Sequence, residues 1–215
     1  MPEVSVIIPA YKAEPFIARA IASLQAQTHT NWEAIIIADD GQDYEKILKE
    51  NGIADRRIRF ATTGRERAGP SAGRNIGMDM VNGSILAHLD ADDAYDNDYL
   101  AIMVPHVKKH GAAVGKMRFI HEASGKENNE LLVLEEDRLL TLLDMIRYNY
   151  AYVNIVFDRN RCPVRWPEVL QYGEDIVIWA MLLDHIPGVY FATAARYNYF
   201  KRDGSLSHLI ESSDT

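Results

Sequence analysis

Cysteine is nearly absent from this sequence: Cys162 is the single one among 215 residues. One cysteine excludes an internal disulfide, and such usage is typical of proteins from a reducing compartment. The longest apolar runs also fall well short of the length that spans a bilayer. Residues 1–14 lack the basic and apolar regions of a signal peptide. We therefore expect a cytoplasmic protein without a transmembrane segment.

Positive charge is scarce as well. Lys and Arg number 23 against 31 Asp and Glu, which gives a formal net charge of −8. This balance disfavours a nucleic-acid partner, because such a partner requires a broad basic surface. It does not exclude phosphate-bearing small molecules, since a bound metal ion supplies positive charge locally. The composition therefore favours a small-molecule ligand.

Strand and helix signals alternate through the first half of the chain. Apolar, β-branched runs predict buried strands over 4–10, 32–41, 57–63 and 83–90, with a further strand near 113–120. Between them, apolar spacing and cap residues predict helices over 15–27, 43–52, 69–81 and 96–110. This alternation indicates an α/β fold with a doubly wound, mainly parallel sheet.

The second half of the chain is more irregular. Its signals predict a strand over 152–157, helices over 136–147 and 173–185, and loops over 121–130 and 162–173. No repeat, low-complexity tract or linker separates the halves, so a single domain over 1–215 is predicted. Residues 111–215 are expected to build the second wall of the site.

Acidic residues gather at two predicted strand ends and at one predicted helix start. They are Asp39, Asp40, Asp90, Asp92, Asp93, Asp96, Glu174 and Asp175. Ligands bind beyond the carboxyl ends of parallel strands, so these acids should converge on one crevice. Like charges this close disfavour each other's ionised forms. A divalent cation, together with the hydroxyls and imide of a sugar nucleotide, would satisfy them.

These polar residues also admit other interpretations. An EF-hand starting at Asp90 requires glycine at position 95 and glutamate at 101, where the sequence has Tyr95 and Ala101. His106 and His110 are interpreted as a solvated helix face rather than a zinc site. Taken singly, the pairs 39–40 and 174–175 could be helix-entry acids that complement a helix dipole.

Four stretches together resemble a family-2 glycosyltransferase with the nucleotide-sugar-binding GT-A fold. They are residues 4–41, 69–93, 173–179 and 197–208. The resemblance implies that residues 1–110 bind the nucleotide sugar and that 111–215 form the acceptor side. It also implies a metal-dependent enzyme that transfers a sugar to an acceptor hydroxyl with inversion, in polysaccharide or glycoconjugate synthesis.

The resemblance also implies roles for individual residues. Those near the nucleotide are Pro9, Ala10, Tyr11, Asp39, Arg74 and Asp90, with Asp39 bonding the imide of the base and Asp90 near the ribose. Asp92 and His208 are the implied ligands of Mn²⁺ or Mg²⁺. Asp175 is the implied catalytic base, with Glu174 beside it. The implied donor is a UDP-sugar.

The implied acceptor is a carbohydrate or a lipid-linked molecule, which would bring the protein to the inner face of the membrane. Two alternatives stay open. A sugar-nucleotide nucleotidyltransferase would be expected to carry a glycine- and arginine-rich loop after its first strand, where this chain has "PAYKAEPF". A catalytically inactive relative would be expected to have lost some of the acids, and all are present here.

Overall fold

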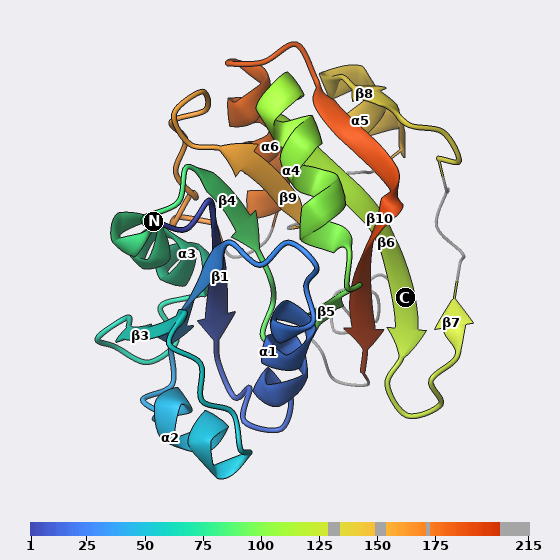
Figure 1. Ribbon diagram of the computed structural model, residues 1–215. Helices are drawn as coiled ribbons and strands as arrows, with labels where there is room; N and C mark the ends of the chain where they lie inside the picture. The colour runs from blue at the N-terminus through green and yellow to red at the C-terminus, as the bar shows by residue number, and fades with distance from the viewer. Residues whose placement is uncertain (129–133, 149–153, 171–172, 203–215) are drawn as a thin grey trace, which may run out of the picture.

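A computed structural model describes residues 1–128, 134–148, 154–170 and 173–202 (Figure 1). Its strands are β1 (Val4–Ala10), β2 (Trp32–Ala38), β3 (Ile58–Thr62), β4 (Ile85–His88), β5 (Ala94–Tyr95), β6 (Ala112–His121), β7 (Glu127–Asn128), β8 (Arg138–Leu140), β9 (Ile155–Asp158) and β10 (Val189–Lys201). Its helices are α1 (Ile17–Gln25), α2 (Tyr44–Glu50), α3 (Pro70–Met80), α4 (Tyr99–His110), α5 (Leu142–Tyr148) and α6 (Glu174–Leu183).

These strands form one sheet in the order β3-β2-β1-β4-β9-β6-β10-β5, with β7 paired to β6 and β8 to β10. Strands β3, β2, β1 and β4 are parallel, and so is the long pairing of β6 with β10. Strand β9 lies antiparallel between β4 and β6. The predicted α/β fold with a doubly wound, mainly parallel sheet is confirmed.

Helices cover both faces of this sheet. Along β1, Val6 and Ile8 point into a core shared with α1, α2 and α4, whereas Ile7 points into a second core that contains Trp179 of α6. Figure 1 shows α4 in front of the sheet and α6 behind it. Cys162 is fully buried in the second core, and burial raises the pKa of its thiol to about 11.

Helix α3 lies close to β1 because it carries glycines on the contacting face. A Cβ atom added at Gly77 would meet Cγ2 of Ile7 at 2.5 Å, whereas one added at Gly73 would lie 3.4 Å from Cβ of Pro9. The helix begins at Pro70 directly after Gly69, whose φ of 95° suits glycine. This close approach places Arg74 near the carboxyl ends of the strands.

The second half corrects two predictions. The helix predicted over 136–147 is wrong in its first part, where β8 pairs with β10 and α5 begins only at Leu142. Thr141 stops the helix from starting earlier, because its Oγ1 accepts a bond from the Asp144 amide while Asp144 accepts from the Thr141 hydroxyl. The loop predicted over 121–130 contains β7, which pairs back onto β6.

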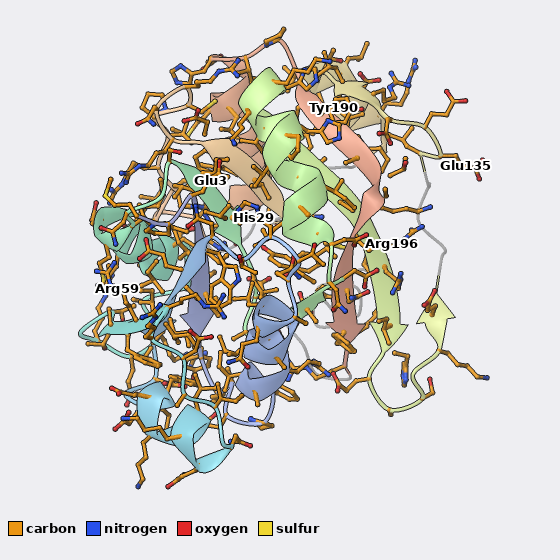
Figure 2. All side chains as sticks on the ribbon, viewed as in Figure 1. Glu3, His29, Arg59, Glu135, Tyr190 and Arg196 are labelled. Carbon is orange, nitrogen blue, oxygen red and sulfur yellow. The ribbon has the colours of Figure 1, made fainter. Side chains whose placement is uncertain are left out.

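The histidines of α4 also differ from their interpretation as a solvated face. The rings of His106 and His110 stack on Tyr190 of β10, with ring centroids 4.1 and 4.7 Å away. Tyr190 is labelled in Figure 2 beside the upper part of α4. These histidines therefore help to attach α4 to the sheet.

Candidate active site

The first residues predicted to bind a nucleotide lie where β1 and β2 end. Pro9 and Ala10 close β1 in register with the end of β2, and Tyr11 follows with 40% of its surface exposed. Asp40 fixes this loop by accepting bonds from the Lys12 amide at 2.5 Å and from the Tyr44 hydroxyl at 2.8 Å. The loop that carries the exposed Tyr11 ring is therefore fixed at the strand edge by polar contacts to Asp40.

Asp39 organises the loop that follows β3. Its Oδ1 accepts bonds from the Thr63 hydroxyl at 2.7 Å and the Ala68 amide at 2.9 Å, and its Oδ2 accepts from the Gly69 amide at 2.9 Å. It is not a helix-entry residue, because Asp43 caps α2. Asp39 thus lies at the predicted edge of the sheet, with its carboxylate anchoring a neighbouring loop.

The four acids after β4 divide into two structural and two site residues. Asp93 is buried and accepts bonds from the Tyr197 hydroxyl at 2.8 Å and the Phe200 amide at 3.0 Å. Asp96 pairs with Arg118 at 3.1 Å. Both acids therefore join the loop after β4 to the strands β10 and β6. The close spacing of carboxylates in the sequence reflects two separate tasks.

Asp92 is held by arginines from outside its own segment. Its carboxylate pairs with Arg202, whose guanidinium lies 4.0 Å from the centroid of the Phe16 ring. Arg19 donates to the Asp92 carbonyl oxygen. Burial raises the pKa of the Asp92 carboxyl, the charge of Asp90 adds to this rise, and Arg202 opposes it. The negative charge of the Asp92 carboxylate is therefore balanced by Arg202, from a distant part of the chain.

Arg74 joins the acids after β4 to those at the start of α6. Its Nη2 lies 3.1 Å from Oδ1 of Asp90, and its Nη1 lies 3.4 Å from Oε1 of Glu174. The side chain of Arg74 is only 4% exposed, so these charges meet where water screens them poorly. The structure thus brings together residues from three segments that the sequence singled out separately.

Trp166, which is buried in the second core, supports Arg74 together with its neighbours, a role that the sequence patterns do not indicate. The guanidinium of Arg74 lies 4.3 Å from the centroid of the Trp166 ring. Asn75 fixes the backbone of Trp166 from both sides, with bonds of 2.9 Å to its carbonyl and from its amide. Asn75 directly follows Arg74 in the sequence, but this adjacency does not identify Trp166 as the partner of either residue.

His88 completes this support from the end of β4. Its Nε2 accepts a bond from Nε1 of Trp166 at 3.2 Å, and its Nδ1 lies 3.4 Å from the carbonyl oxygen of Ile155. Burial, and then the charge of Arg74, lowers the pKa of His88 to about 3. The ring is therefore neutral at physiological pH and contributes hydrogen bonds but no charge.

Asp175 lies in the first turn of α6 with an unusual carboxyl group. Its Oδ1 is buried and has no hydrogen-bond partner in the described part of the chain. Burial raises the pKa of Asp175 to about 7, which Arg74 opposes and the charges of Glu174 and Asp90 reinforce. A carboxyl group titrating near neutrality has the property expected of a general base.

The donor atoms of the site suit a hard cation. Asp90 and Asp92 offer the carboxylate oxygens that Mg²⁺ and Mn²⁺ prefer. Within the described ranges, no group of three or more His, Cys, Asp or Glu side chains could hold a metal ion by itself. A hard cation held by Asp90 and Asp92 would therefore need further oxygen ligands to complete its coordination. His208, the other predicted ligand, lies outside the described residues.

Comparison with solved structures shows a shared fold. TarS from S. aureus in complex with UDP-GlcNAc superposes with a TM-score of 0.78 at 19% sequence identity, over 95% of this chain and 60% of that one. Among the described residues, no helix combines the length and apolarity needed to cross a membrane.

Sequence relatives point in the same direction. The Escherichia coli protein WfgD, a UDP-Glc:α-D-GlcNAc-diphosphoundecaprenol β-1,3-glucosyltransferase, is 32% identical over 84% of this chain and 69% of its own length. The succinoglycan biosynthesis protein ExoO of Rhizobium meliloti is 29% identical over 98% of this chain and 64% of its own. The chain thus spans less than two thirds of ExoO and of the TarS chain.

The family model described as "Glycosyl transferase family 2" matches residues 5–173. This range takes in the strand ends that carry Asp39, Asp90 and Asp92, together with Arg74 on α3. Because the match covers well over half of the sequence, the chain belongs to glycosyl transferase family 2.

Proposed function

We propose that the protein is an inverting, metal-dependent glycosyltransferase that moves a sugar from a UDP-sugar to an acceptor hydroxyl. The observation that carries the proposal is the position of Arg74 between Asp90 and Glu174. It ties an acid after a central strand to the first turn of α6, where Asp175 titrates near neutrality. The donor sugar and the catalytic base would thus meet on either side of the buried Arg74 guanidinium.

On the donor side, the loop of Pro9, Ala10 and Tyr11 would line the nucleobase of the UDP-sugar. Asp39 would accept a hydrogen bond from the imide of the nucleobase, in addition to the hydrogen bonds that it accepts from the loop after β3. Asp90 would lie near the ribose. Arg74, with its fixed positive charge, would favour binding of the anionic nucleotide.

Asp92 would be the direct protein ligand of Mn²⁺ or Mg²⁺, with His208 as a further ligand. A bound divalent cation would neutralise the charge that develops on the departing diphosphate. Arg202 pairs with the Asp92 carboxylate in the structure, so Asp92 would have to exchange this partner, at least in part, for a metal ion.

In the chemical step, the acceptor oxygen forms a bond to the anomeric carbon of the donor sugar. The bond from that carbon to the diphosphate oxygen breaks, and its electron pair leaves with the UDP. Asp175 takes the proton from the acceptor hydroxyl, a contribution worth roughly 10²–10⁴-fold in rate. A single displacement of this kind inverts the anomeric centre and needs no covalent enzyme intermediate.

The acceptor proposed here is based on the acceptors and products for which two relatives are named. WfgD is named for a sugar linked to diphosphoundecaprenol, and ExoO for the synthesis of a polysaccharide. We extend this to a carbohydrate acceptor carried on a polyprenyl diphosphate. Such an acceptor lies in a membrane, so the protein would work from the cytoplasm at the inner membrane face.

Calorimetric titration with UDP tests the donor and metal assignments together. The protein should bind UDP in the presence of Mn²⁺, and EDTA should weaken this binding at least about tenfold, because the diphosphate would then lose the positive charge of the cation next to Asp90 and Asp92. Asp92→Ala should lose the dependence on Mn²⁺ while staying folded. GDP and dTDP, titrated in parallel, identify the base that the site prefers.

Asp98→Ala is the matched control. Asp98 is an exposed acid close to Asp92 in sequence, and its side chain makes no capping bond to α4. This variant removes the same charge and should bind UDP as the parent does. If Asp92→Ala binds UDP with Mn²⁺ as tightly as the parent does, and EDTA still weakens this binding as it does for the parent, the metal assignment is wrong.

A further inference from the structure

Acids lie on two sides of Arg74, but they do not by themselves fix its guanidinium group. The contacts with Asp90 and Glu174 are 3.1 and 3.4 Å long, longer than the distance of about 2.7–2.9 Å that is usual for a charge-assisted hydrogen bond. The Nε atom of Arg74 is buried and has no hydrogen-bond partner in the described part of the chain. A further contact is therefore needed to fix the plane of the guanidinium.

The indole of Trp166 supplies this contact. The Arg74 guanidinium lies 4.3 Å from the centroid of the indole, and Trp166 is only 2% exposed. An aromatic face at this distance attracts a guanidinium and shields that side of it from water. Where water is excluded, charges are screened less, so Arg74 attracts a nearby anion more strongly. The orientation of the indole therefore sets the plane in which Arg74 presents its N–H groups.

Trp166 is itself fixed by hydrogen bonds from two elements. Its carbonyl and amide both bond to the side chain of Asn75, the residue after Arg74, at 2.9 Å. Its Nε1 donates to Nε2 of His88 at 3.2 Å, and the two rings stand edge-on with centroids 5.0 Å apart. His88 is fully buried, and its ring stacks on that of Phe157 with centroids 5.8 Å apart. The indole cannot turn without leaving buried nitrogen atoms unpaired, which is costly.

We infer that Trp166 is a positioning residue for the donor, which holds the Arg74 guanidinium toward the nucleotide site from its buried position. The inference rests on the proposed function, in which Arg74 favours binding of the anionic nucleotide. The segment at the end of β4 acts on Arg74 in two ways. Asp90 pairs with the guanidinium directly, whereas His88, two residues earlier, fixes the indole on which the guanidinium lies.

The chain offers a matched control at the opposite end of the sheet. Trp32 is also 2% exposed, and the guanidinium of Arg57 lies 3.6 Å from the centroid of its ring. Arg57 pairs with Asp55 at 2.7 Å. Trp32 begins β2, whereas the candidate site lies where β1 and β2 end. The same substitution at Trp32 therefore removes a buried indole beneath an arginine, but far from the site.

Calorimetric titration of the full chain with UDP and Mn²⁺ tests the inference. Trp166→Leu removes the aromatic face and should weaken UDP binding at least about fivefold. Trp166→Phe keeps an aromatic face but loses the bond to His88, so it should weaken UDP binding only about 2–3-fold. Trp32→Leu and Trp32→Phe should bind UDP as the parent does. Urea unfolding of each variant checks that it is folded at the temperature of the titration.

Substitution of Arg74 shows whether Trp166 acts through it. Arg74→Lys keeps the charge but presents no planar group to the indole. In this background, Trp166→Leu should change UDP affinity less than about twofold, because the two substitutions remove the same interaction. A tryptophan with a purely structural role would give the same loss of affinity in both backgrounds.

Three results would each overturn the inference. They are unchanged UDP affinity in Trp166→Leu, an equal loss of affinity in Trp32→Leu, and an undiminished effect of Trp166→Leu in the Arg74→Lys background. If Trp166→Leu does not fold, Trp166→Phe and Trp32→Phe carry the same comparison, and equal affinities of these two variants for UDP contradict the inference.

The parent protein separates this inference from the proposed function. If the parent fails to bind UDP with Mn²⁺, the proposed function is contradicted, and the inference with it. If the parent binds UDP and the Trp166 variants bind it equally well, only the inference fails.

Discussion

Arg74 shows how the free energy of a single buried side chain shapes this site. Burying a guanidinium is costly unless charge partners surround it, and Asp90 and Glu174 supply them. The ring of Trp166 covers its face at 4.3 Å, an arrangement that suits a planar guanidinium better than an ammonium group. Removing either acid would leave a buried charge partly uncompensated, so the residues around Arg74 act as one unit.

Asp175→Asn should lower turnover by roughly 10²-fold or more while leaving UDP affinity within a few-fold. The reason is that asparagine cannot accept the proton of the acceptor hydroxyl, although it keeps the shape of the side chain. Steady-state kinetics with a lipid-linked acceptor, and UDP calorimetry, measure the two effects. Asp98→Asn serves as a control that also removes an acidic charge. Turnover near that of the parent would refute the base assignment.

The pH dependence gives a second check on the same residue. Because the pKa of Asp175 is raised from 3.8 to about 7, the native protein holds its proton where the unfolded chain has lost it. Native stability should therefore fall as pH rises from about 4 to about 7, and Asp175→Asn should lack this part of the fall. Urea unfolding of both proteins at pH 5 and pH 8 measures the difference. Over the same range, kcat/KM should rise as the base ionises.

Only part of this site could be predicted from residue patterns. The acids at strand ends were predictable because parallel strands deliver their carboxyl ends to one edge. The division of labour after β4 was not, since the partner of Asp93 is Tyr197, about a hundred residues further along the chain. Trp166 was likewise unpredictable, because its contact with Arg74 depends on how a loop folds back over α3.

Among the elements, α3 depends on its glycines for its position on β1. Gly77→Ala should destabilise the protein by about 1–3 kcal/mol, since the new methyl group would lie 2.5 Å from Cγ2 of buried Ile7. Gly73→Ala should cost far less, because its Cβ would make an ordinary 3.4 Å contact and alanine favours the helix. Urea denaturation of both variants gives the comparison. Equal losses would show that the close approach at Gly77 is not what limits the helix.

The elements of the first half were predicted well because each is local. Buried strands such as 4–10 are continuous apolar runs, and their helices carry their own cap and spacing signals. In the second half, the strand β10 over Val189–Lys201 was not predicted at all. Its register shifts between Ala192 and Arg196, and it pairs with β6, β8 and β5 at once. Such pairings are decided by distant partners and leave little trace in a short window.

At the scale of the whole molecule, the sheet does not separate into the predicted halves. Strand β9, from the second half, pairs with β4 on one side and with β6 on the other. Helix α4, which ends the first half, packs through His106 and His110 onto Tyr190 of β10. The sheet therefore continues across the boundary near residue 110. The functional division at that boundary, into a nucleotide-sugar half and an acceptor half, stays a prediction.

The burial of Cys162 makes the labelling rate of its thiol a measure of how often the second core opens. Its thiol is fully buried beside β9 and α6, with a pKa of about 11, so a thiol reagent at neutral pH should label it only after the second core opens. If UDP and Mn²⁺ bind only the closed protein, labelling should slow by the factor 1 + [UDP]/Kd. Mass spectrometry of the labelled fraction over time measures this factor. A labelling rate indifferent to UDP would mean that the second core opens while the nucleotide stays bound. If UDP does slow the labelling, the reaction rate of this one sulfur atom gives the affinity of the protein for UDP.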